Sequence, residues 1–236
     1  MLGFMRKKAH VRSRRMTTTP GKAIAGSPAK PGGRRQRRVT PYHHGALREA
    51  LLTAAERILE RDGMPGLTLR AAAREAGVSH AAPTHHFGDL AGLLSELAAL
   101  GFQRFREMLL AAADRETEPA SRLDAMGRAY VSFAKKYPGI FTLMFRAERL
   151  DTARPALSDA MDAAGSALAQ AVGAQRGEAI VKGTPSLAQA AGIVRAWAIA
   201  HGLAVLLLDG RLDNILSKLP PGETEEALVR AVLKRP

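Results

Sequence analysis

No cysteine occurs among the 236 residues, and aromatic side chains make up only 5% of them. The missing cysteine excludes disulfide bonds, thiolate metal sites and cysteine nucleophiles. The scarcity of aromatic residues argues against sheets, because strands are enriched in aromatic and β-branched side chains. Alanine and leucine instead dominate the apolar residues, which make up 46% of the chain and favour helices. The composition therefore predicts an all-α protein with a sizeable core.

Acidic residues are absent from the first forty-eight positions, which hold thirteen of the 35 lysines and arginines. The remaining 22 basic residues equal the 22 acidic residues, so the net charge of +13 belongs to the N-terminal segment. Prolines and glycines interrupt residues 1–40 and no apolar face can form there, so we expect a disordered basic arm. Such an arm favours a polyanion, either nucleic acid or an anionic membrane surface.

A secretory signal peptide is not expected, because the N-terminal segment has no apolar stretch of the required kind. A transit peptide is a minor alternative, and Met16 is an alternative start. The longest apolar run, residues 196–208, is too short and too interrupted to span a bilayer. We therefore expect a soluble, cytoplasmic and nucleoid-associated protein without a membrane partner.

Apolar periodicity predicts three helices over residues 45–87. We expect the first to end at Gly63, Thr68 to cap the second, and Ser79 to cap the short third helix. The turn around Gly77 joins two short helices, and this arrangement is typical of a helix-turn-helix. The sequence thus predicts such a unit near the N-terminus.

The helical pattern continues to the end of the chain. Helices are expected over residues 89–114, 121–136, 138–149, 155–172, 185–208 and 224–235, with a loop over 173–184. Thr184 and Pro185 supply the start of the helix over 185–208. This helix is apolar almost all round, so it must be buried on several sides, within the subunit or against a partner.

The stretch VSHAAPTHHFGDL, residues 78–90, places three histidines close together. His80, His85 and His86 are five and six residues apart, a spacing that does not bring them to one point for a metal. No Gly-rich phosphate loop and no G-x-S-x-G motif is present, so we expect neither an enzyme nor a cofactor. A weak metal site or a His-dependent hydrolase is the alternative, which needs convergent acidic partners.

A recognition helix presents small and polar side chains to DNA bases, and the same stretch offers such a set. These residues are Ser79, His80, Ala81, Thr84 and His85. If Ser79 is the cap, Pro83 stands at the fourth helical position and removes one backbone hydrogen bond. A plain solvated face is the alternative for the exposed histidines, and packing beside Phe87 is the alternative for His86.

Residues 42–94 resemble the DNA-binding domain of TetR/AcrR-type transcriptional regulators, through the combination G-V-S-x-x-x-x-x-x-H-F. The stretches YPGIFTLMF, residues 137–145, and AWAIAHGLAVLLLDG, residues 196–210, are similar to a subgroup with a Trp-His-Gly signature. Trp197, His201 and Gly202 stand at the signature positions. The resemblance implies an arm over residues 1–40, a helix-turn-helix domain over 41–88, and a helical regulatory and dimerisation domain over 89–236.

The resemblance also implies a homodimer that offers two recognition helices to a palindromic operator in double-stranded DNA. The DNA-binding residues it implies are Tyr42, His43, His44, Thr68, Arg70, Ser79, His80, Ala81, Thr84, His85 and His86. Two positions depart from the family pattern: Thr84 replaces a frequent tyrosine and Leu90 replaces a frequent lysine. Both changes weaken the grip of the bare domain, and the basic arm compensates by releasing counterions from phosphates.

The C-terminal helices are implied to form a ligand cavity, and the helices over 185–208 and 224–235 a four-helix dimer interface. The candidate cavity residues are Phe102, Phe105, Phe133, Phe141, Met144, Phe145, Met161, Trp197 and His201. The alternative for each is a plain core position, and for His201 a core histidine with a hydrogen-bond partner. We expect a repressor that an unidentified small molecule releases from DNA. The alternative is a constitutive architectural protein that binds DNA through its arm.

Overall fold

The computed structural model describes residues 43–180 and 184–234, so the predicted arm over residues 1–40 lies outside it. Within these ranges all regular structure is helical, which confirms the predicted fold class. The elements are α1 (His43–Gly66), α2 (Leu69–Glu75), α3 (Ala82–Phe87), α4 (Leu90–Ala113), α5 (Pro119–Lys136), α6 (Pro138–Met144), the 3₁₀ helix η1 (Ala147–Arg149), α7 (Pro155–Arg176), α8 (Leu187–Leu208), α9 (Asp213–Leu216) and α10 (Glu225–Leu233).

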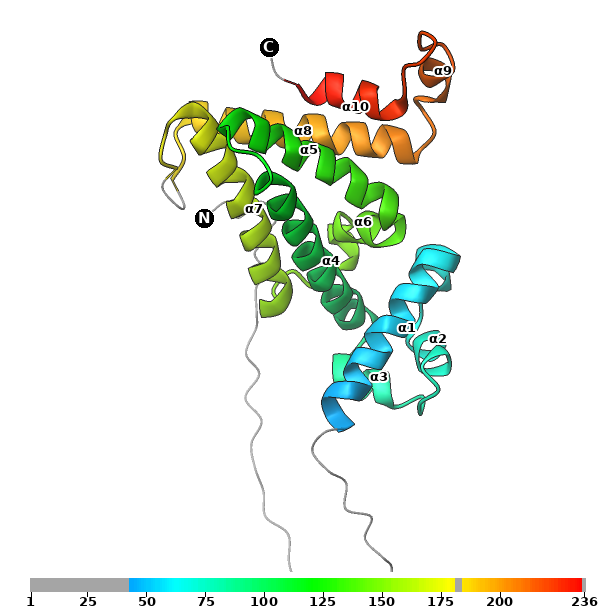
Figure 1. The fold of residues 1–236 in the computed structure, drawn as a ribbon. Helices are drawn as coiled ribbons and strands as arrows, with labels where there is room; N and C mark the ends of the chain where they lie inside the picture. The colour runs from blue at the N-terminus through cyan, green and yellow to red at the C-terminus, as the bar shows by residue number, and fades with distance from the viewer. Residues whose placement is uncertain (1–42, 181–183, 235–236) are drawn as a thin grey trace, which may run out of the picture.

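The helices α1, α2 and α3 form a small unit at one end of the molecule, and α5, α8 and α10 lie across the opposite end (Figure 1). The long helices α4 and α7 run between the two ends and pack against each other. One apolar core extends from α1 through α4 to α8. Phe87 and Phe133 are among its largest fully buried side chains.

The helix α1 leaves helical geometry at Gly63, where φ is 68° and ψ is −174°. This is the predicted end of the first helix, and one further turn follows it up to Gly66. A positive φ favours glycine because a side chain there is strained. The buried face of α1 carries Leu51, Ala54, Ala55, Ile58 and Leu59.

The turn between α2 and α3 is set by local backbone hydrogen bonds. Gly77 has a φ of 67°, and its N–H donates to the carbonyl of Arg74 at 3.1 Å. The Val78 N–H donates to the carbonyl of Ala73 at 3.0 Å, and the Val78 side chain packs against the core. These two bonds make a left-handed helix ending that satisfies otherwise unpaired carbonyls. The predicted turn at Gly77 is confirmed.

One of the two predicted caps in this unit is wrong. The Thr68 hydroxyl accepts a hydrogen bond from the Ala71 N–H at 3.0 Å, as a capping residue does. The helix α3, however, begins only at residue 82, and its first flanking residue is Ala81 rather than Ser79. Pro83 consequently lies in the first turn, where a backbone N–H has no helical partner, so the proline costs no hydrogen bond.

Several boundaries in the second half also differ from the prediction. The helix α7 runs to Arg176, beyond the expected end at residue 172, because Gly177 supplies the left-handed residue that ends it. The helix α8 starts after Ser186, not at Pro185, because Ser186 and Gln189 form a reciprocal capping box. The expected helix over residues 138–149 is divided into α6 and η1, and α9 was not expected.

The helix α8 is long and apolar enough to cross a membrane by length and composition, with 22 residues and a mean hydropathy of 1.8 over its most apolar window. The prediction that the apolar run over residues 196–208 is too short is therefore wrong, because the helix extends past it to Leu187. Core helices of soluble proteins pass the same test. Only 22% of that window is buried, however, so α8 keeps an apolar face uncovered by its own chain.

Candidate DNA-binding surface and ligand cavity

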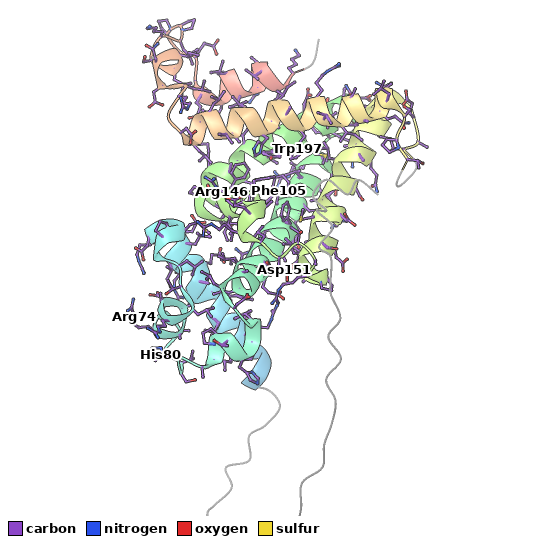
Figure 2. The ribbon with its side chains drawn as sticks, turned by 180° about the vertical axis from the view of Figure 1, so that it is seen from behind. Arg74, His80, Phe105, Arg146, Asp151 and Trp197 are labelled. Atoms are coloured by element: carbon purple, nitrogen blue, oxygen red, sulfur yellow. The ribbon has the colours of Figure 1, made fainter. Side chains whose placement is uncertain are left out.

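The outer face of the α2–α3 unit is exposed and carries polar and small side chains. Ser79, His80, Ala81, Thr84 and His85 are all exposed on this face. Figure 2 shows Arg74 and His80 at the outer edge of the unit, away from α4. The apolar side chains of the unit point the other way, into the core.

The helix α2 adds cations to this face. Arg70 and Arg74 are exposed and four residues apart, so they share one side of the helix. Neither makes an ion pair within residues 43–180 and 184–234. Thr68 is exposed beside them, and its hydroxyl can donate its proton while it accepts the capping bond. Sequence reasoning missed Arg74, which the helical spacing from Arg70 could have revealed.

His86 of α3 differs from His80 and His85 because it is half-buried. Its ring lies 5.3 Å from the His85 ring and 6.1 Å from the Phe87 ring, measured between centroids. No three side chains of the type that bind metals come together in the described part of the chain. Tyr42 lies outside the described residues, and so do the side chains of His43 and His44, whose backbones begin α1.

A cavity of about 890 Å³ lies among α4, α5, α7 and α8. Six of the predicted residues line it: Phe102, Phe105, Met144, Phe145, Met161 and Trp197. Figure 2 shows Phe105 and Trp197 in the interior between α4 and α8. The wall also includes Tyr130, Met126 and Leu109, which sequence reasoning did not single out. They were missed because apolar periodicity shows which helix face is inside, but not which inside positions border a gap.

Three predicted cavity residues do not line the cavity. Phe133 is fully buried between the rings of Phe105 and Tyr137, at centroid distances of 5.2 Å from each. Phe141 packs on Tyr130 with ring centroids 5.8 Å apart and is 2% exposed. Both are core residues that support the wall from behind, which explains why their aromatic character misled the prediction.

His201, the third of these, lies behind the wall in a short hydrogen-bonded chain. The Trp197 indole N–H donates to the Tyr130 hydroxyl at 3.3 Å, and that hydroxyl lies 2.8 Å from Nδ1 of His201. Because the indole can only donate, the tyrosine proton is directed to His201. In this arrangement Nδ1 of His201 accepts, and the neutral ring carries its proton on Nε2.

Burial supports the same protonation states. It raises the pKa of the Tyr130 hydroxyl, so this group stays protonated, and it lowers the pKa of His201. The ring of His201 also packs on Phe145, with centroids 4.6 Å apart. The Tyr130–His201 pair is therefore a polar contact inside an aromatic cluster, next to the cavity that the Tyr130 side chain lines.

Charged side chains of α5, α7 and α8 also border the cavity. Asp124, Asp162, Arg176 and Arg195 are among the lining residues. Arg176 pairs with Glu178 at 3.0 Å. Arg195 is exposed on α8. The cavity wall is thus mainly apolar and aromatic, and it includes charges of both signs.

Comparisons with known proteins agree with this architecture. The family model for bacterial regulatory proteins of the tetR family matches residues 51–97, and the model for the tetracyclin repressor-like C-terminal domain matches residues 123–232. A protein of unknown function from Rhodococcus sp. RHA1 is 38% identical, with a TM-score of 0.63 over 82% of this chain and 92% of that one. No curated protein gives a significant match.

Two more distant structures share the fold. The transcriptional regulator FadR from Bacillus subtilis, solved with stearoyl-CoA, is 14% identical, with a TM-score of 0.57 over 78% of this chain and 95% of that one. AibR, solved with isovaleryl coenzyme A and operator DNA, is 16% identical, with a TM-score of 0.53 over 78% and 94%. At such identities the likeness shows the fold alone. The two family models, which together match most of the chain, show that it belongs to the TetR family of bacterial transcriptional regulators.

Proposed function

We propose that the chain is a cytoplasmic repressor that binds a palindromic operator as a homodimer and leaves it when a small molecule fills the cavity. The observation that carries the proposal is the exposed α2–α3 face, joined through α4 to a cavity large enough for a ligand. In this proposal residues 41–88 bind DNA, and residues 89–236 bind the ligand and the second subunit.

The chemistry of the exposed face suits a DNA duplex. Arg70 and Arg74 have cationic side chains that can contact phosphates, and Thr68 has a hydroxyl donor for the same purpose. The side chains at the start of α3 are small enough to enter a major groove, where Thr84 and the exposed histidines can reach base edges. His86 is half-buried, so we assign it to packing and to the nearest phosphates rather than to bases.

The homodimer accounts for the uncovered face of α8. Val194, Ile199 and Leu206 of α8 are between 39% and 43% exposed, and Val232 of α10 is 44% exposed. All of these except Leu206 also border the cavity, so the exposed face is continuous with its opening. Large apolar side chains gathered on one face of a monomer mark an interface. The helices α8 and α10 pack against each other, so a second copy related by a two-fold axis completes a four-helix bundle.

The cavity wall suits a largely apolar molecule with a polar end. Its volume of about 890 Å³ lies within the usual range of roughly 300–1,000 Å³ for small-molecule sites. The charged lining residues, such as Asp162 and Arg195, provide polar contacts. FadR and AibR were solved with acyl-coenzyme A ligands in the same fold, which supports an acyl compound as a first class to test.

The ligand acts in this proposal by selecting a conformation. The two recognition helices of a dimer must lie about one duplex turn apart, roughly 34–36 Å, to enter successive major grooves. A ligand that binds better to a subunit arrangement with another spacing depletes the DNA-competent state. Repression without ligand and dissociation from DNA with ligand thus both follow from the difference between the ligand's affinities for the two subunit arrangements.

The test is fluorescence anisotropy on an operator selected from random DNA by the full-length protein. Affinity is measured over a salt series, for the full chain and for a chain without residues 1–38. We expect strong sequence preference in both forms, with weaker affinity and a shallower salt dependence after deletion, because fewer counterions are released. Equal binding to all sequences that vanishes with the arm contradicts the repressor and favours the architectural alternative.

A further inference from the structure

The C-terminal end of α3 is held by two arginines from different parts of the chain. Arg154, just before α7, donates a hydrogen bond from Nη2 to the backbone carbonyl of Phe87 at 2.8 Å. The guanidinium of Arg48, from α1, lies 5.9 Å from the centre of the Phe87 ring. Both arginines also pair with Glu96 of α4, Arg154 at 3.8 Å.

The contact between Arg154 and Phe87 depends on a glycine of α4. A Cβ atom at Gly92 would lie 2.0 Å from the Phe87 carbonyl oxygen and 2.4 Å from Nη2 of Arg154. Real Cβ atoms do not approach other atoms so closely. The guanidinium therefore reaches the end of α3 across Gly92, where α4 has no side chain between them.

The hold on the Arg154 guanidinium is incomplete. Its Nε is buried without a hydrogen bond in the described part of the chain, and the Asp151 carboxylate lies 3.6 Å from it. Glu96 lies at a similarly long distance of 3.8 Å. Short charge-assisted hydrogen bonds are roughly 2.7–2.9 Å long, and only the bond to Phe87 falls in this range. One short bond thus carries most of the contact with α3.

The segment that carries Arg154 also forms part of the cavity wall. Thr152 and Ser158, on either side of Arg154, line the cavity. The Ser158 N–H donates to the Arg154 carbonyl at 3.0 Å, so both belong to the first turn of α7. The Asp151 N–H donates to the Ser95 hydroxyl of α4 at 2.8 Å. Figure 2 shows Asp151 at the level where α4 meets the α1–α3 unit.

From these contacts we propose that Arg154 is a positioning residue that transmits occupancy of the cavity to the recognition helix. A molecule that displaces the first turn of α7 withdraws the guanidinium from the Phe87 carbonyl and leaves the end of α3 less constrained. The inference rests on the proposed function and names its route of regulation. Such a device is a two-state packing contact that a ligand biases.

The first test measures hydrogen exchange of backbone amides in the full-length chain without DNA. In Arg154→Ala we expect amides over residues 84–88 to exchange about tenfold faster, because the end of α3 opens more often. Exchange in α5 and α8 should stay unchanged. Arg154→Lys should give an intermediate rate, because an ammonium can reach the carbonyl but does not reproduce the planar fork.

The matched control is Arg149→Ala, which removes an exposed arginine of the neighbouring η1. It should leave the exchange of α3 as in the parent chain. Unchanged exchange of α3 in Arg154→Ala overturns the proposal. If Arg154→Ala loosens the whole fold, amides of α5 and α8 accelerate as well, and Arg154→Lys decides by whether α3 alone responds.

A second test addresses the coupling to the cavity with the apolar dye 1-anilinonaphthalene-8-sulfonate. Bound dye should accelerate exchange of α3 in the parent chain and add nothing in Arg154→Ala. Ser158→Phe, which adds a ring at the cavity wall, gives the same comparison without a dye. Equal acceleration with and without Arg154 in both comparisons overturns the proposed route.

These readouts need no DNA, so they separate the two proposals. A parent chain that fails to prefer any operator contradicts the proposed function, whatever α3 does in exchange. If the parent chain binds its operator, but hydrogen exchange of α3 depends neither on Arg154 nor on occupancy of the cavity, only the proposed coupling is contradicted.

Discussion

His201 shows how one residue links the core to solution pH. It is a neutral acceptor for the Tyr130 hydroxyl and packs among aromatic rings, and burial lowers its pKa. A proton added to the ring binds at Nδ1, the atom that accepts the hydrogen bond from the tyrosine hydroxyl, so that hydrogen bond is lost. The folded state therefore binds this proton less readily than the unfolded state does.

We predict that acid weakens the fold partly through this histidine. Because the folded pKa is depressed, the contribution of His201 is complete above its unfolded pKa, near pH 6.5, and is lost as the pH falls below that value. Urea unfolding at pH 8, 7, 6 and 5 should show a smaller decline for His201→Asn than for the parent chain. His80→Asn, an exposed control, should follow the parent, and identical declines for all three contradict the assignment.

The two arginines of α2 are proposed to act as single charges toward DNA. Each is exposed, and neither has an ion-pair partner in the described part of the chain. We predict that Arg74→Ala lowers operator affinity and reduces the slope of log affinity against log salt by about 1, as for one lost phosphate contact. Arg106→Ala, an exposed change on α4, should leave both unchanged. If the salt slope of Arg74→Ala equals that of the parent chain, Arg74 does not contact DNA.

At the scale of elements, the ends of short helices depend on which residue supplies the cap. The helix α2 has a side-chain cap in Thr68, whereas α3 follows Ala81 and has none. The α3 helix is held instead by the core contacts of Pro83 and Phe87, which are both buried. The unit therefore combines one locally stabilised helix with one that depends on packing.

We predict different results for the alanine substitutions of Thr68 and Ser79. Thr68→Ala should lower the free energy of unfolding by about 1 kcal/mol, because the Ala71 N–H loses its partner. Ser79→Ala should change it by less than about 0.5 kcal/mol, as expected for an exposed side chain that caps nothing. Urea unfolding measures both, and an equal loss in Ser79→Ala means that Ser79 does cap α3 in solution.

For the whole molecule, the arrangement places DNA contacts and the uncovered apolar face at opposite ends (Figure 1). The α1–α3 unit lies at one end, and α8 with α10 at the other. The helices α4 and α7 connect them, so the proposed coupling between the cavity and the DNA-binding face runs through these two helices. A dimer formed through α8 and α10 thus leaves both recognition faces free.

We predict that Leu206→Glu converts a dimer into a monomer. The side chain is 40% exposed on α8, and a charge in the middle of an apolar interface is costly to bury. Light scattering after size exclusion should fall from about twice the chain mass of 25.2 kDa to the chain mass itself. Thr142→Glu, on an exposed position of α6, should remain dimeric. A parent chain that is already monomeric contradicts the interface.

Local signals in the sequence sufficed for the helical class, the family, the turn at Gly77 and the cap at Thr68. These features depend on residues within about one helical turn, since a positive φ or a capping hydroxyl acts on its immediate neighbours. The choice between Ser79 and Ala81 as the start of α3 was not local, because core packing of Pro83 and Phe87 set where that helix begins.

Contacts between distant residues depended on how the helices pack. Periodicity placed Phe105 and Phe133 alike on inner faces, and packing made the first a cavity wall and the second solid core. Arg154 meets a carbonyl of α3 that precedes it by 67 residues, across a glycine of α4. No sequence pattern predicts this hydrogen bond, because it depends on the relative positions of three helices. These positions follow from the sum of many apolar contacts.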